Sequence, residues 1–70
     1  MEKIRVFYDK EGQTLTVWFD DPSKEHITEE TGDEVILIKD KAGRVIGFER
    51  LNVVFPAESE GGIPLEAITV

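Results

Sequence analysis

Val35-Ile36-Leu37-Ile38 is followed by Asp40-Lys41-Ala42-Gly43, and then by Val45-Ile46-Gly47-Phe48-Glu49-Arg50-Leu51. The outer two stretches are rich in β-branched and aromatic residues, and the middle one has the Asp and Gly that turns favour. The sequence therefore predicts a β-hairpin whose first strand is apolar on both faces. Gly47, inside the second strand, indicates a β-bulge or the close approach of another backbone.

A second hairpin is predicted nearer the N-terminus, around a turn at residues 9–13. Residues 4–8 and 14–19 alternate with a period of two, which is typical of strands. The first strand places Ile4, Val6 and Tyr8 on one face and Arg5 and Phe7 on the other; the second places Leu15, Val17 and Phe19 on one face and Thr14, Thr16 and Trp18 on the other. Because each of the two turns joins two strands, the chain hints at a pseudo-repeat of hairpins.

The remaining segments are less regular. Residues 20–23 end the second strand, and residues 26–30 are expected to form a short edge strand before a turn at 31–33. Pro56 stops the ladder, and residues 63–70 are predicted to form either one helical turn or a short strand. We expect an all-β (or β-rich α+β) fold, an antiparallel meander of four to five strands built from two hairpins. Residues 1–70 would form a single domain, with core hairpins at 1–52 and a covering or dimerisation segment at 53–70.

Composition narrows the range of functions. The chain has 70 residues, 15 acidic and 8 basic, for a net charge of -7, and it has no cysteine. Disulfides, thiolate nucleophiles and cysteine-ligated metals are excluded. The acidic balance argues against direct nucleic-acid binding and against docking on anionic membranes. The absence of cysteine and of a signal-peptide pattern leads us to expect a cytoplasmic protein.

Candidate chemistry is sparse. His26 with Glu25 and Glu29 could ligate a divalent cation, but their spacing matches no metal motif, and a solvated polar loop is the favoured interpretation. The acidic stretch 25–34 fits either protection of an edge strand or recognition of a basic protein partner. Tyr8 with Asp9 and Glu49 could suggest acid/base chemistry, although an exposed cross-strand charge and a core-facing tyrosine explain them better. We predict no catalytic residue and no cofactor.

The residues quoted above form a recognisable set. Tyr8-Asp9, the Gly-containing turn, Leu15-Thr16-Val17-Trp18-Phe19 and the hairpin at residues 35–51 resemble the domain of unknown function 2283 family, a group of small prokaryotic β proteins. The resemblance covers residues 4–20 and 34–52. Arg50 stands where the family more often has an aliphatic residue. The resemblance implies a β fold and brings no assigned activity.

Apolar residues on both faces of the predicted sheet suggest self-association. A sheet with one face in water is expected to carry polar residues on that face. Trp18 and Phe7 instead lie on the face opposite the aliphatic residues of their strands. We expect a homodimer or higher oligomer whose interface uses Trp18, Phe48, Val54 or Phe55; the alternative is that the C-terminal segment folds back over the sheet. The leading hypothesis is a non-enzymatic interaction module that self-associates and binds a protein partner. The alternatives are a small metal-dependent enzyme or ligand-binding factor using His26 and nearby acids, and a regulator paired with a toxin or a DNA-binding protein.

Overall fold

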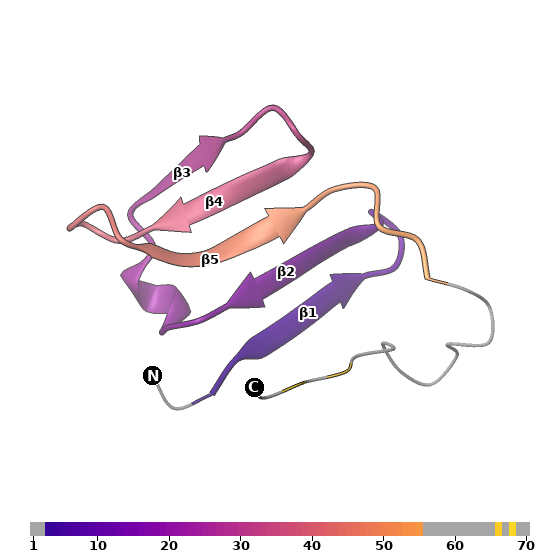
Figure 1. The fold of residues 1–70 in the computed structure, drawn as a ribbon, viewed down its shortest axis with the longest axis horizontal. Helices are drawn as coiled ribbons and strands as arrows, with labels where there is room; N and C mark the ends of the chain where they lie inside the picture. Colours follow the sequence, from indigo (N-terminus) through magenta and orange to yellow (C-terminus); the bar gives the residue numbers. More distant parts are fainter. Residues whose placement is uncertain (1–2, 56–65, 67, 69–70) are drawn as a thin grey trace.

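The computed structural model describes residues 3–55, 66 and 68. These residues form five strands and one short 3₁₀ helix (Figure 1). In chain order the elements are β1 (Arg5–Asp9), β2 (Thr14–Trp18), η1 (Pro22–Lys24), β3 (Ile27–Glu30), β4 (Val35–Lys39) and β5 (Val45–Arg50). The all-β prediction is confirmed, and β3 is the predicted edge strand. The helical turn or strand expected at 63–70 lies outside the described residues.

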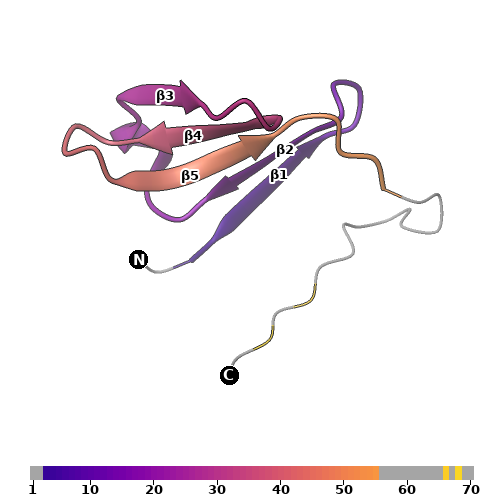
Figure 2. The ribbon, with the colours of Figure 1, turned by 45° about the horizontal axis from the view of Figure 1, so that its top comes forward.

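The strands form one antiparallel sheet in the order β1-β2-β5-β4-β3. The sheet consists of two consecutive units, β1–β2 and β3–β4–β5, joined by the pairing of β2 with β5. The chain therefore crosses from β2 to the far edge, and η1 lies on this crossing at the end of the sheet where β5 begins (Figures 1 and 2). Two backbone hydrogen bonds fix the crossing, from Phe19 N to Ile46 O (2.7 Å) and from His26 N to Lys39 O (2.9 Å).

The strand register aligns the alternating side chains into two faces. Residues directly opposite each other on neighbouring strands share a face. One row across the sheet runs Val6, Val17, Phe48, Leu37 and Glu29, and the next row on the same face runs Tyr8, Leu15, Arg50 and Val35. We call this side the apolar face. The second face carries rows of Arg5, Trp18, Gly47, Ile38 and Thr28, and of Phe7, Thr16, Glu49, Ile36 and Glu30.

Gly47 is required where β5 crosses behind Trp18. A Cβ at this position would lie 2.5 Å from the carbonyl oxygen of Val17 and 3.2 Å from Cε3 of the Trp18 ring. The β4–β5 register also shifts by one residue beside Gly47, where Ile38 pairs with Gly47 but Lys39 pairs with Val45. Both interpretations of Gly47 from the sequence, a bulge and a close backbone approach, therefore hold.

The core is thin for a folded domain. Among the described residues, two apolar side chains are buried: Ile38, which is 4% exposed, and Ile46, which is 3% exposed. Ile38 lies on the second face, and the apolar side chains that β1, β2, β4 and Phe48 place on the apolar face are only half-buried. The only helix in residues 3–55 is the three-residue η1, which is far too short to cross a bilayer.

Candidate functional site

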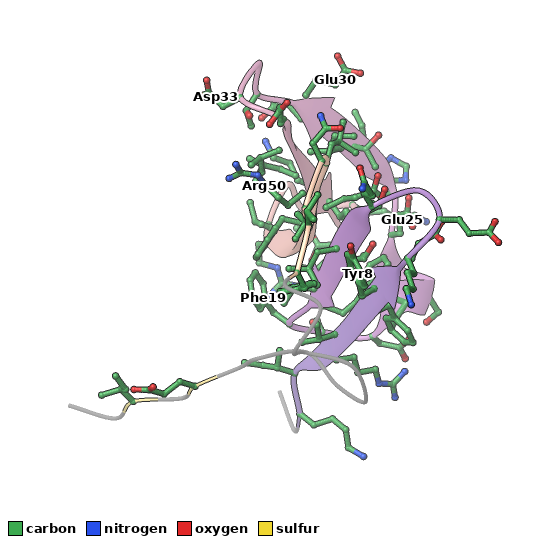
Figure 3. All side chains as sticks on the ribbon, turned by 90° about the vertical axis from the view of Figure 1, so that its right-hand side faces the viewer. Tyr8, Phe19, Glu25, Glu30, Asp33 and Arg50 are labelled. Carbon is green, nitrogen blue, oxygen red and sulfur yellow. The ribbon has the colours of Figure 1, made fainter. Side chains whose placement is uncertain are left out.

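The apolar face presents a continuous row of half-buried apolar side chains across β1, β2, β5 and β4. Its aromatic residues cluster at two places. The rings of Phe19 and Phe48 lie 5.9 Å apart near the start of β5, and the rings of Tyr8 and Phe55 meet edge-to-face at 4.8 Å near the end of β1. Figure 3 shows the side chains of Phe19 and Arg50 on the same side of the sheet. Aromatic pairs of this geometry add to the stabilisation from burial, yet both clusters remain partly exposed to solvent.

Residues 53–55 are anchored beside the Tyr8 end of the apolar face. The Tyr8 hydroxyl donates a hydrogen bond of 2.6 Å to the carbonyl oxygen of Val53. The backbone N–H of Val53 donates to the carbonyl oxygen of Gln13 at 2.8 Å. The positive φ of Asn52 (56°) redirects the chain after β5 so that both bonds form. Tyr8 thus faces the core with its hydroxyl at the rim, as the sequence predicted.

The four predicted interface residues do not lie together. Phe48 is on the apolar face, and Phe55 reaches it by packing on Tyr8. Trp18 is on the second face, where its ring covers Gly47. Val54 is 70% exposed. A single flat interface on the apolar face could include Phe48 and Phe55 but not Trp18.

The tyrosine and carboxylates considered for acid/base chemistry are separated. Tyr8 is on the apolar face, whereas Glu49 lies opposite Thr16 on the second face. Asp9 lies in the first turn, where its Oδ1 accepts hydrogen bonds from the backbone amides of Glu11 (3.1 Å) and Gly12 (3.2 Å). The structure therefore does not bring these residues together as a catalytic group.

The weak metal candidates are also not assembled. In the described part of the chain, no group of three or more His, Asp or Glu side chains is close enough to hold a metal ion. Glu29 is engaged elsewhere, because its Oε1 accepts a hydrogen bond from Lys39 Nζ at 3.1 Å. His26 instead lines a hollow at the end of the sheet, together with Glu25.

The acidic stretch forms one edge of the sheet. All four residues of β3 are exposed, and Glu25, Asp33 and Glu34 on either side of it are exposed as well. Charged side chains on an edge strand hinder pairing with other chains. The arrangement agrees with edge protection, and recognition of a basic partner stays a prediction.

Asp40 is the most completely bonded polar side chain of the described residues. It is 6% exposed. Its Oδ1 accepts from the backbone amides of Ala42 and Arg44, both at 2.9 Å, and its Oδ2 accepts from Arg44 Nε at 3.0 Å. The hydrogen bond from the Arg44 backbone amide is the main cause that lowers the pKa of Asp40, with the Arg44 side chain adding to it against the effect of burial. The sequence indicated a turn here but not that its Asp would be buried and paired with an exposed Arg44.

A hollow of about 320 Å³ lies beside this turn. Its lining comes from two segments, residues 23–26 at the end of η1 and just after it, and residues 40–44 between β4 and β5. Lys24, His26, Lys41 and Arg44 contribute the basic or protonatable side chains. The two segments are distant in sequence, and the backbone bond from His26 N to Lys39 O brings them together, so no spacing in the sequence could have indicated the hollow.

A family model described as "Protein of unknown function (DUF2283)" matches residues 5–53. The chain belongs to the DUF2283 family. The match spans all five strands and confirms the resemblance inferred from the residues. No curated protein matches the chain, and no solved structure does. Membership of DUF2283 brings no assigned activity, so any function must be argued from the geometry.

Proposed function

We propose that this DUF2283 protein is a non-enzymatic interaction module that self-associates by packing its apolar face against the same face of a second copy. One observation carries the proposal. Apart from Ile46, no apolar residue of this face is buried within the described chain. These half-exposed residues are Val6, Tyr8, Leu15, Val17, Phe19, Val35, Leu37 and Phe48.

Such a face is costly in an isolated sheet. Burying apolar surface contributes roughly 25 cal/mol per Å², and a chain of this length has little other core to rely on. A monomer rarely leaves a contiguous apolar patch of several strands open to water. Self-association is a common way for small domains to complete a core.

Cover by the C-terminal segment of the same copy is the competing explanation. Residues 53–55 cover only the Tyr8 end of the face. Ile68 is 75% exposed, so its side chain does not complete the core in this structure. These observations support cover by a second copy.

Charge placement allows a clean test. Arg50 is exposed and lies on the apolar face opposite Leu15 and Val35, whereas Arg5 is exposed on the second face opposite Trp18. Arg50→Glu places an acid on the proposed interface without removing any apolar side chain. Arg5→Glu makes the same charge change on the other face and is the matched control.

Light scattering on size-fractionated full-length protein over a wide concentration range measures the outcome. We expect a dimer for the unmodified chain and for Arg5→Glu. For Arg50→Glu we expect a dissociation constant raised by roughly tenfold or more, because the short Glu side chain buries its charge in the interface, whereas the long aliphatic stem of Arg keeps the guanidinium in water. A protein that is monomeric at every concentration would overturn the proposal. Nuclear Overhauser contacts between Phe48 and residues 56–70 would then identify cover by its own chain.

The enzymatic alternative has less support. It needs His26 and nearby carboxylates to converge, and the described residues contain no such cluster. Recognition of a basic protein by the acidic β3 edge is compatible with self-association through the apolar face, because the two surfaces are different parts of the sheet.

A further inference from the structure

Basic side chains gather at one place on this acidic protein. The chain has only 8 Lys and Arg residues, against 15 acids. Three of those eight, Lys24, Lys41 and Arg44, line the hollow beside the second turn, together with His26. Screening at physiological salt acts over about 8 Å, so the groups within the hollow, and not the net charge of the chain, determine what binds there.

The two acids of the lining, Asp40 and Glu25, offset part of this charge. Asp40 is buried, and all its hydrogen bonds go to the turn: two backbone amides and Arg44 Nε. The Asp40 carboxylate thereby holds the guanidinium of Arg44 in place. Glu25 is exposed and makes no ion pair among residues 3–55.

Arg44 is positioned to bind a second anion. Within the described residues, Nε is the only side-chain nitrogen of Arg44 that donates a hydrogen bond, and the side chain is 75% exposed. Its two Nη groups therefore remain free to donate. A guanidinium presents its donors in a planar fork that matches carboxylate and phosphate oxygens, and fixing one edge of the fork reduces the entropy lost on binding.

The other cations can adapt to a ligand. Lys41 makes no ion pair among residues 3–55. Lys24 pairs with Asp20 at 3.2 Å, but both side chains are solvent-exposed, so the pair is weak and can exchange for another anion. The Ser23 and His26 side chains lie on the same lining and can add hydrogen bonds.

We propose that this hollow binds a small oxyanion, the phosphate or carboxylate group of a small molecule, with Arg44 and Lys41 as its main binding residues. The volume of about 320 Å³ is at the lower end of the range for small-molecule sites. The hollow is formed by turns at the end of the sheet and not by the apolar face. The proposal therefore does not depend on self-association.

Backbone amide shifts in two-dimensional NMR test the site on the full chain. Sodium phosphate and sodium succinate are titrated separately at pH 7, with sodium chloride holding the ionic strength constant. We expect saturable shifts, confined to residues 23–26 and 40–44, with at least one of the two probes. A response to phosphate alone assigns a phosphate ligand, and a response to succinate alone assigns a carboxylate.

Two lysines provide a matched pair of variants. Lys41 and Lys10 each follow the first Asp of a turn, but only Lys41 lines the hollow. Lys41→Gln should raise the dissociation constant of the responding probe by roughly threefold, the size expected for loss of one partly exposed ion pair. Lys10→Gln should leave it unchanged. Shifts that never saturate, that spread over the surface, or that respond equally to the two variants would overturn the proposal.

Discussion

The hairpin turns at residues 9–13 and 40–44 share a sequence pattern and differ in how they use it. Residues 9–13 and 40–44 each begin with Asp-Lys and have Gly in the fourth position. In the first turn the carboxylate of Asp9 is exposed and accepts from two backbone amides at 3.1 and 3.2 Å. In the second, Asp40 is buried and accepts from two amides and a guanidinium at 2.9 to 3.0 Å. The fifth residue of the turn explains the additional hydrogen bond, because the Arg44 side chain can donate to the Asp40 carboxylate.

The two glycines also have different reasons to be glycine. Gly43 has a φ of 82° and nothing within 4 Å of where a Cβ would lie, so its backbone conformation, and not a lack of space, disfavours other residues. Gly12 has no positive φ, but a Cβ there would lie 2.9 Å from Asp9 Oδ2. The left-handed residue of the first turn is instead Gln13, with a φ of 56°. A shared pattern therefore predicts a turn without predicting which residue carries its conformational constraint.

Substituting the first aspartate of each turn should give the largest difference in thermal stability between the two turns. We expect Asp40→Ala to lower the Tm by roughly 10 °C, because two amides and a guanidinium lose their acceptor. Asp9→Ala should have a much smaller effect, because water can replace an exposed carboxylate. Thermal unfolding followed by circular dichroism measures both. Equal effects of the two substitutions would show that burial of Asp40 adds nothing to the turn.

The loss of thermal stability caused by Asp40→Ala should depend on pH. The folded pKa of Asp40 is lowered, so its contribution to stability is fully present above the unfolded pKa near 4 and is lost as the pH falls through the folded value. Asp20 and Asp21 also have lowered pKa values, chiefly because of the backbone amides of Asp21 and Ser23 respectively. The difference in Tm between the unmodified chain and Asp40→Ala should therefore shrink as the pH falls from about 5 to strongly acidic values. A difference that stays constant to low pH would contradict an ionised Asp40 as the acceptor.

Substituting the glycine of each turn should give a smaller difference in the free energy of unfolding. Gly43→Ala should cost about 1–2 kcal/mol, because an L-residue is strained at positive φ. Gly12→Ala should cost less than about 1 kcal/mol, since the exposed Asp9 side chain can move away at the loss of two weak hydrogen bonds. Urea unfolding at neutral pH measures both values. Gly43→Asn is the control for the conformational argument, because Asn tolerates the left-handed region better than Ala and should recover part of the loss.

The sequence predicted the strands well because their signal is local. Alternation in residues 4–8 and 14–19 and the continuous apolar run at 35–38 each specify a strand without reference to the rest of the chain. The pairing of β2 with β5 is not local, and it separates Trp18 from Phe48 onto opposite faces. The hollow depends on that topology too, because only the crossing from β2 to β3 brings His26 beside the turn at Asp40. Residues that acquire a role through long-range pairing, such as His26, carry no pattern that a single sequence can reveal.

The smallest expected effect lies at the residue that the first turn uses in place of glycine. Gln13 has a φ of 56°, and its carbonyl oxygen accepts the hydrogen bond from Val53 N that holds the chain after β5. Gln13→Gly should stabilise the protein by less than about 1 kcal/mol, because relief of left-handed strain is partly offset by greater freedom of the unfolded chain. Gln13→Val should act in the opposite direction, since a β-branched residue is disfavoured at positive φ. If urea unfolding gave the same stability for both variants, the backbone at residue 13 would not be constrained, and the first turn would owe its shape to Gly12 as the second does to Gly43.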